Sequence, residues 1–219
     1  MLTAENVGLA YGETVALKNA SATVSAGEIV ALVGPSGSGK STLLYCMSGI
    51  VTPDRGDITF DGRLLGGMAD DELSEVRRRS FGFVFQFAEL VPELTLRENV
   101  TLPMEINRVP RRERRGRAIE LLERLGILAE ADRRPSQVSG GQAQRAAVAR
   151  ALSHRPQVVF ADEPTGSLDS SNGDVVLDVL ASVARQDGTA VVLVTHDDKI
   201  AQAADRRIPL SDGTTSAQE

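Results

Sequence analysis

A glycine-rich segment near the start of the chain has the first residues whose types and spacing could do chemistry. Its residues are Gly34, Pro35, Ser36, Gly37, Ser38, Gly39, Lys40 and Ser41, followed by Thr42. The order matches G-x-x-x-x-G-K-[ST], in which backbone N–H groups and the start of the next helix hold phosphate oxygens. Lys40 would reach the β- and γ-phosphates, and Ser41 would bind Mg²⁺. The segment therefore predicts a site for a nucleoside triphosphate, ATP or GTP.

Two neighbouring carboxylates form the second candidate site. Asp162 and Glu163 follow the apolar run 158–161, which is typical of a buried parallel strand. The carboxyl ends of parallel strands face the ligand, so both side chains would lie beside the bound phosphates. Asp162 suits a Mg²⁺ ligand and Glu163 suits a base that orients water, as metal-assisted phosphoryl transfer requires. The alternative is a helix start with acidic residues before Pro164. It is disfavoured because the glycine-rich segment 34–41, called the phosphate loop below, occurs in the same chain.

A third segment, Ser139, Gly140, Gly141 and Gln142, precedes a helical pattern that runs to Leu152. Ser139 and Gln142 have the spacing of a capping box, so a purely structural explanation exists. Glycine inside a helix is about 1 kcal/mol less favourable than alanine, and two glycines in the first turn favour a backbone that something approaches closely. We interpret the segment as a second phosphate-binding helix start.

The net charge, the cysteine count and the lengths of the apolar runs limit the kinds of partner and compartment that suit this chain. The chain has 219 residues and a net charge of −6, with 30 acidic against 24 basic residues, so electrostatics gives no reason to expect nucleic acid. Cys46 is the only cysteine, which excludes an internal disulfide and suits a reducing cytoplasm. No run reaches the roughly 20 apolar residues of a membrane helix, and no signal peptide is recognisable. If a membrane is involved, another chain must cross it.

Strand and helix patterns alternate and indicate an α/β fold with a mostly parallel sheet. The expected strands are 29–33, 58–60, 81–85, 158–161 and 190–194, and the expected helix 173–186 separates the last two. Residues 1–26 suggest antiparallel strands around positions 11–13. We expect one domain, 1–219, whose nucleotide-binding core and β subdomain comprise 1–86 and 157–219, with a helical subdomain inserted at 87–156. After Leu210 only a short polar tail is expected.

A run of basic residues lies in the expected helical insertion. Six arginines occur between Arg108 and Arg117, and Pro110 could open a helix there. The usual interpretation is a solvated helix face. Contact with anionic lipid headgroups is a minority interpretation, which requires this subdomain to face the membrane.

The order of these segments resembles the ATPase subunits of ABC transporters over nearly the whole chain. Residues 34–41 are similar to the Walker A loop, 138–142 to the signature motif, and 158–162 to the Walker B strand. The resemblance also identifies Tyr11 as the aromatic that stacks on adenine, Gln86 as the Q-loop glutamine, Glu163 as the catalytic glutamate, Asp169 as part of the D-loop, and His196 as the switch histidine. The signature is the specific element, because many NTPases share Walker motifs. Val138 stands where the family usually has leucine, a mild apolar exchange.

The resemblance implies an ATP site shared by two copies of the chain. The copies would pair head to tail, with each ATP between the phosphate loop of one copy and Ser139–Gly141 of the other. Gln142 and Asp169 would complete the nucleotide contacts. The metal ligands would be Ser41, Gln86 and Asp162. The catalytic side chains would be Lys40, Glu163 and His196.

The resemblance also implies a membrane partner. In this family the segment after the Q-loop glutamine, here Phe87–Thr95, helps form the groove that receives part of the permease subunit. Its apolar side chains would equally suit the core of the helical subdomain. Residues 83–86, 94–100 and 162–169 are similar to the branch of lipoprotein-release, macrolide-export and antimicrobial-peptide-resistance ATPases. The chain would then be cytoplasmic, held at the inner face of the cell membrane by its permease.

Two other classes remain as alternatives. Soluble or regulatory ABC-type ATPases, which act in cell division, on DNA or in translation, would share these motifs without moving solute. The sequence has no long coiled-coil insertion, which argues against the ATPases that act on DNA ends. It has only one cassette, which argues against translation factors. An ordinary P-loop kinase or GTPase would leave Ser139–Gln142 and His196 without a role, and no Asn-Lys-x-Asp segment that reads guanine occurs.

Overall fold

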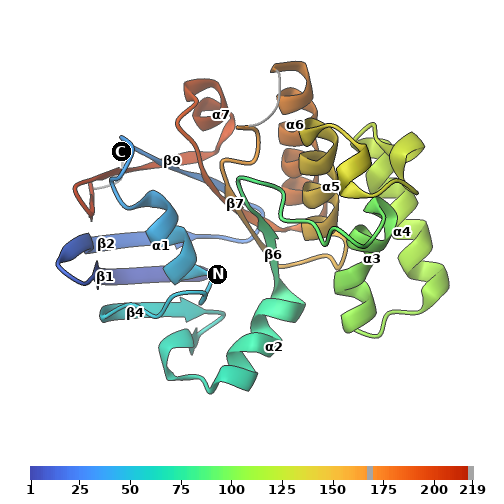
Figure 1. Ribbon diagram of the computed structural model, residues 1–219. Helices are drawn as coiled ribbons and strands as arrows, with labels where there is room; N and C mark the ends of the chain where they lie inside the picture. The colour runs from blue at the N-terminus through green and yellow to red at the C-terminus, as the bar shows by residue number, and fades with distance from the viewer. Residues whose placement is uncertain (167–169, 217–219) are drawn as a thin grey trace.

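A ten-stranded sheet forms the framework of the protein (Figure 1). The computed structural model describes residues 1–166 and 170–216. Within these ranges the strand order is β5-β4-β1-β2-β10-β9-β3-β8-β7-β6. The strands are β1 (Leu2–Tyr11), β2 (Thr14–Val24), β3 (Ile29–Val33), β4 (Arg55–Phe60), β5 (Arg63–Leu64), β6 (Phe81–Val84), β7 (Val158–Asp162), β8 (Ala190–Val194), β9 (Arg206–Ser211) and β10 (Thr214–Thr215).

Helices cover both faces of the parallel half of this sheet. They are α1 (Lys40–Met47), α2 (Asp70–Ser80), α3 (Leu96–Ile106), α4 (Arg111–Arg124), α5 (Gly140–Leu152), α6 (Ser170–Asp187) and α7 (Asp198–Ala203). Short 3₁₀ turns occupy Leu65–Gly67, Leu128–Glu130 and Pro135–Gln137. Among the described residues, no helix combines the length and the apolar character that crossing a membrane requires.

The strands β9, β3, β8, β7 and β6 lie side by side in parallel. The sequence predicts all of these strands except β9. In β7, Val158 lies opposite Ala190 of β8. Val159 and Ala161 pack into one hydrophobic core and Phe160 into the other, on the opposite face. Because both faces are buried, the strand is apolar from Val158 to Ala161, and its last residue is Asp162. The carboxyl ends of these strands meet at one edge of the sheet, where the phosphate loop, Glu163 and His196 follow.

Antiparallel strands form the other half of the sheet. The β1–β2 hairpin turns at Gly12, whose φ is 60°, and Tyr11 lies opposite Thr14. Strand β4 pairs with β1 on the side away from β2, with Leu2 opposite Phe60. The antiparallel β layer predicted from residues 1–26 is therefore confirmed. Strand 58–60, expected with the mostly parallel strands, instead pairs antiparallel on both sides within this layer.

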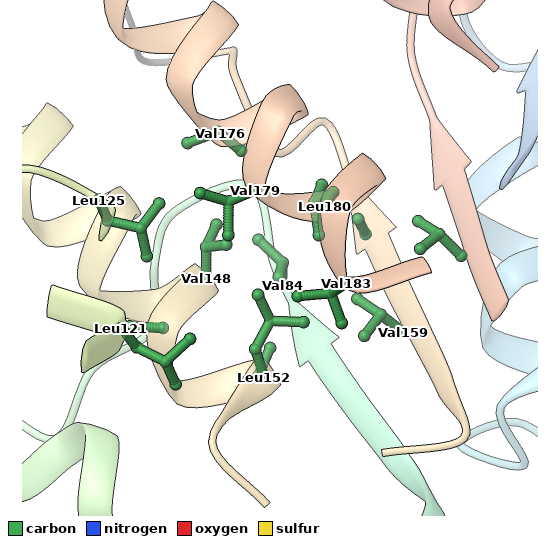
Figure 2. Packing of buried hydrophobic residues seen from close by; sticks show 14 of the residues in the cluster. Val84, Leu121, Leu125, Val148, Leu152, Val159, Val176, Val179, Leu180 and Val183 are labelled. Atoms are coloured by element: carbon green, nitrogen blue, oxygen red, sulfur yellow. The ribbon is translucent and has the colours of Figure 1, made fainter. Parts of the chain in front are cut away.

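Helices α3, α4 and α5 form a lobe beside the parallel strands (Figure 1). Figure 2 shows the core that joins this lobe to the sheet and to α6. Its labelled members are Val84, Leu121, Leu125, Val148, Leu152, Val159, Val176, Val179, Leu180 and Val183. The buried face of α4 includes Ala118, Leu121 and Leu122, and the helical pattern that ends at Leu152 produces the buried face of α5. The division of the chain into a core and an inserted helical subdomain remains a prediction.

The segment around Leu210 differs from the expectation. Residues 206–211 form β9, in which Ile208 and Leu210 are buried, and residues 214–215 form β10. Thr214 pairs with Ser211 and with Asn19 of β2. The expectation of only a short polar tail after Leu210 is therefore wrong. The strand escaped notice because its two buried side chains alternate with arginine, proline and serine.

The basic run contributes to the fold as well as to the surface. Helix α4 begins directly after Pro110, as the sequence suggests. Arg114 pairs with Glu105 of α3 at 2.9 Å, and Arg117 pairs with Glu120 at 2.7 Å. Both arginine side chains are largely buried. The interpretation of a wholly solvated face is therefore wrong for these two residues.

Candidate active site

The phosphate loop joins β3 to α1 at the ligand-facing edge of the sheet. Two of its glycines are required by close approach of the backbone. Gly34 has φ 148°, and a Cβ atom there would lie 2.1 Å from the carbonyl oxygen of Leu210. Gly39 has φ 103°, and its Cβ would lie 2.5 Å from the carbonyl oxygen of Ala16. Neighbouring strands thus hold the loop in a conformation that larger residues disfavour.

Lys40 extends across the loop that precedes it. Its Nζ donates to the carbonyl oxygens of Gly34, at 2.9 Å, and Pro35, at 2.7 Å. The ammonium group is therefore held beside the backbone turn. Ser38 carries a buried hydroxyl without a hydrogen-bond partner among the described residues. A fixed ammonium, an unsatisfied hydroxyl and the N-terminus of α1 fit a phosphate group.

Ser41 and Asp162 form an oxygen pair beside the loop. Oγ of Ser41 donates to Oδ1 of Asp162 at 3.0 Å. Hydroxyl and carboxylate oxygens are ligands that Mg²⁺ prefers, usually with phosphates and waters completing its coordination. Over residues 1–166 and 170–216, no group of three or more His, Cys, Asp or Glu side chains could hold a metal ion alone. The pair therefore fits a Mg²⁺ ion that also contacts the nucleotide.

Glu163 connects two other predicted site residues. Its Oε1 lies 3.0 Å from Nδ1 of His196, and its Oε2 accepts from Nε2 of Gln86 at 3.2 Å. The backbone N–H of Glu163 donates to the carbonyl oxygen of Val194 at 3.0 Å. The backbone φ of Glu163 is 47°. This conformation is uncommon for a residue with a side chain and is concentrated at functional sites. The sheet edge thus holds a carboxylate between an amide and an imidazole.

A cavity of about 570 Å³ brings these groups together. The lining residues are Thr14, Val15, Ala16, Ser36, Gly37, Gly39, Lys40, Ser41, Thr42, Gln86, Glu163, Val194 and His196. The sequence did not predict the contribution of Thr14–Ala16, which the β1–β2 hairpin brings over the loop. Nothing in the types of these three residues indicates a nucleotide site. The only signal is their position just after the Tyr11 turn.

Tyr11 and the signature segment lie outside this lining. Tyr11 is 53% exposed at the end of β1. Ser139 and Gly140 are exposed at the start of α5. Asp169 lies outside the described residues. In one copy of the chain, the structure therefore does not bring the two predicted phosphate-binding segments into one cavity.

The capping box at the start of α5 is formed. Oγ of Ser139 accepts from the backbone N–H of Gln142 at 3.2 Å, and Oε1 of Gln142 accepts from the N–H of Ser139 at 2.9 Å. The structural explanation is therefore present, because the box uses the residues on either side of the two glycines, and the role of the segment in binding phosphate stays a prediction. A Cβ at Gly140 would meet nothing within 4 Å. The glycine therefore leaves an open approach to the helix N-terminus.

A second cavity, of about 510 Å³, lies between α2, α3 and the end of α5. We call it the α2–α3 groove. Its apolar lining includes Phe83, Phe85 and Ile106, and its polar lining includes Arg150 and His154. Arg150 fastens the turn after Gln86 by donating to the carbonyl oxygens of Ala88 and Glu89. From the predicted docking segment 87–95, only Glu89 lines this groove. Phe87 is 79% exposed and Leu90 packs against the helical core.

Comparison with known proteins gives the family. The model of the ABC transporter family matches residues 17–166. The lipoprotein-releasing system ATP-binding protein LolD of Bacteroides fragilis (strain YCH46) is 42% identical over 213 residues, covering 97% of this chain and 99% of that protein. Two solved dimeric structures of the ATP-binding cassette MJ0796, one of them in a post-hydrolysis state bound to ADP and Pi, are 41% identical, with a TM-score of 0.93. Each of these matches covers 100% of this chain and 98% of the MJ0796 chain. The branch that the motifs predict is confirmed, and this chain belongs to the ABC transporter family.

Proposed function

We propose that two copies of this chain bind and hydrolyse ATP together and thereby drive conformational change in a separate membrane permease. As a member of its family the chain is an ATP-binding and ATP-hydrolysing subunit. One observation carries the proposal of a pair: Ser139 and Gly140 lie exposed, apart from the cavity that holds the phosphate loop. A second copy would present its own α5 N-terminus to this open cavity. The dimeric structures of MJ0796 support such pairing.

The positions of the side chains suit hydrolysis. Glu163 would orient a water molecule and accept its proton, and His196 would contact the γ-phosphate. Lys40 would move from the loop carbonyl oxygens to the β- and γ-phosphates. Mg²⁺, bound by Ser41 and Asp162 with Gln86 nearby, would neutralise charge that develops on the phosphates.

ATP would favour the paired state because its γ-phosphate contacts both copies. Loss of this phosphate removes contacts that exist only with ATP, and the equilibrium then shifts towards separated copies. Gln86 lies two residues after the end of β6 and contacts Glu163. The same strand lines the groove between α2 and α3 with Phe81, Gly82 and Phe83. Hydrolysis and the groove thus share one structural element.

The groove would receive a segment of the permease. Its apolar floor and the exposed Ile106 at its rim suit an amphipathic partner helix. We place the chain in the cytoplasm, at the inner face of the membrane. A soluble ABC-type ATPase without a permease, the alternative function, would give this groove no role.

Oligomeric state tests the pairing. Glu163→Gln protein should be a dimer with Mg-ATP and a monomer with Mg-ADP or without nucleotide, as measured by light scattering. The double variant Glu163→Gln/Ser139→Arg should bind ATP and stay monomeric, because a long side chain would block the α5 N-terminus. A dimer that forms equally in all nucleotide states, or that survives Ser139→Arg, would contradict the shared site.

Stimulation of ATP hydrolysis tests the groove. With the membrane component of its own transport system in liposomes, the chain should hydrolyse ATP faster than alone. Ile106→Asp should abolish this stimulation and leave hydrolysis by the free chain unchanged, because Ile106 lies outside the ATP cavity. Leu64→Asp, at an exposed position outside the α2–α3 groove, is the matched control.

A further inference from the structure

Tyr45 contacts the proposed metal ligand from the same helix as Ser41. The Tyr45 hydroxyl donates to Oδ2 of Asp162 at 2.9 Å, while Ser41 Oγ donates to Oδ1 at 3.0 Å. Ser41 and Tyr45 are four residues apart in α1, so they lie on one face of the helix, one turn apart. The two hydroxyl groups thus hold the two oxygens of a single carboxylate.

The surroundings make this contact strong and persistent. Asp162 is only 7% exposed, and the Tyr45 ring packs against the core beneath α1. A phenol hydroxyl is protonated at neutral pH and is therefore a hydrogen-bond donor. A hydrogen bond to a charged acceptor is also stronger than one between neutral groups.

We propose that Tyr45 is a positioning residue, which fixes the rotation of the Asp162 carboxylate so that Oδ1 stays beside Ser41 and both oxygens would be available to hold a metal ion. Without the Tyr45 hydroxyl, Oδ2 would lose its donor and the carboxylate could rotate away from Ser41. Groups that orient a metal ligand in this way typically change metal affinity about 10- to 100-fold when they are removed. The inference rests on the proposed role of Asp162 as a Mg²⁺ ligand.

A simpler role for Tyr45 is packing alone. Tyr45→Phe separates the two roles, because it keeps the ring and removes only the hydroxyl. Ser48→Ala is a matched control: its buried hydroxyl, one turn further along, donates to the backbone oxygen of Tyr45 at 3.0 Å and not to Asp162. Both variants remove one hydroxyl group from the same part of the core.

The test uses Mn²⁺ in place of Mg²⁺, with ADP, so that no turnover is needed. Free Mn²⁺ is measured by electron paramagnetic resonance as it is titrated into protein saturated with ADP. Tyr45→Phe should bind Mn²⁺ about 10- to 100-fold more weakly than the wild type, with unchanged ADP affinity in the absence of metal. Ser48→Ala should bind Mn²⁺ like the wild type.

Asp162→Asn distinguishes failure of this inference from failure of the proposed metal site. If Asp162→Asn weakens Mn²⁺ binding and Tyr45→Phe matches the wild type within about threefold, Tyr45 serves packing alone and the inference is wrong. If neither variant changes Mn²⁺ binding, the proposed role of Asp162 is wrong as well. Weaker binding by Ser48→Ala to the same degree as Tyr45→Phe would also overturn the inference, because the effect would then not depend on the contact with Asp162.

Discussion

Nδ1 of His196 lies 3.0 Å from Oε1 of Glu163, although the imidazole is 71% exposed. The contact therefore joins a side chain at the surface to one that is mostly covered. Exposed side chains contribute little to stability, whereas a group beside the reacting phosphate contributes to the rate. His196 is thus a position where the two effects can be measured separately.

His196→Ala should change the free energy of unfolding by less than about 0.5 kcal/mol, because the ring is mostly solvated. Hydrolysis should fall by about 10²-fold, the typical cost of losing one group that stabilises transition-state charge. Thermal unfolding and phosphate release measure the two quantities. A destabilised protein, or one that retains full turnover, would contradict the assignment.

Glu163→Gln should retain ATP binding and lose hydrolysis by about 10²- to 10⁴-fold, the usual contribution of a positioned base. The amide oxygen can still accept from Gln86, so the local geometry is expected to persist. Binding is measured with labelled ATP and hydrolysis by single-turnover release of phosphate. Turnover within tenfold of the wild type would exclude Glu163 as the base.

Gly34→Ala and Gly37→Ala each change one glycine of the phosphate loop, but the loss of stability and of ATP affinity should be larger for Gly34→Ala. Gly37 has φ 77° and open space around it, so its substitution should cost about 1–2 kcal/mol of stability. Gly34→Ala should cost more and should weaken ATP binding, because its Cβ would lie 2.1 Å from the Leu210 carbonyl oxygen. Urea unfolding and nucleotide titration of both variants provide the comparison. Equal losses would show that the close contact is easily relieved.

Glu28→Gln should lower stability at neutral pH and have little effect in acid. Burial raises the pKa of Glu28, but the hydrogen bonds from Arg206 and the Ser25 backbone amide outweigh it, and the net pKa lies below the ordinary 4.5. Because the folded-state pKa is the lower one, this contribution to stability is present above the unfolded-state pKa and is lost as pH falls through the folded-state pKa. The expected loss at pH 7 is about 1–3 kcal/mol.

Urea unfolding of Glu28→Gln and the wild type, at pH 7 and after acidification below the folded-state pKa, measures this difference. Glu13→Gln, in the exposed β1–β2 turn, is the control and should behave like the wild type at both values. A difference between Glu28→Gln and wild type that stays constant with pH would show that the ion pair with Arg206 does not carry the effect.

The parallel half of the fold could be predicted because its strands are continuous apolar runs between helices. Strand β7 shows the reason: both of its faces are buried, so every residue from Val158 to Ala161 is apolar. Strand β9 could not be recognised in the same way. Only Ile208 and Leu210 are buried there, and Pro209 lies between them, a residue that argues against a strand in sequence reasoning.

The candidate site was predictable where side chains carry the chemistry. Lys40, Glu163 and His196 stand out by type and spacing, and the structure places all three on one cavity. The contribution of residues 14–16 could not be predicted, because it depends on how the β1–β2 hairpin folds over the loop. The role of Tyr45 could not be predicted for a related reason. It depends on the contact with Asp162, which lies more than a hundred residues later in the chain.

The pairing of β9 with β3 sets the order in which the ATP site can be completed during protein synthesis. The phosphate loop leaves the ribosome early, yet its backbone rests against Leu210, and the N–H of Gly213 donates to the carbonyl oxygen of Ser38 at 3.1 Å. A nascent chain that ends before β9 therefore has the loop sequence without the support for its conformation. We therefore expect ATP binding to begin only after β9 and β10 have emerged, long after the phosphate loop was made.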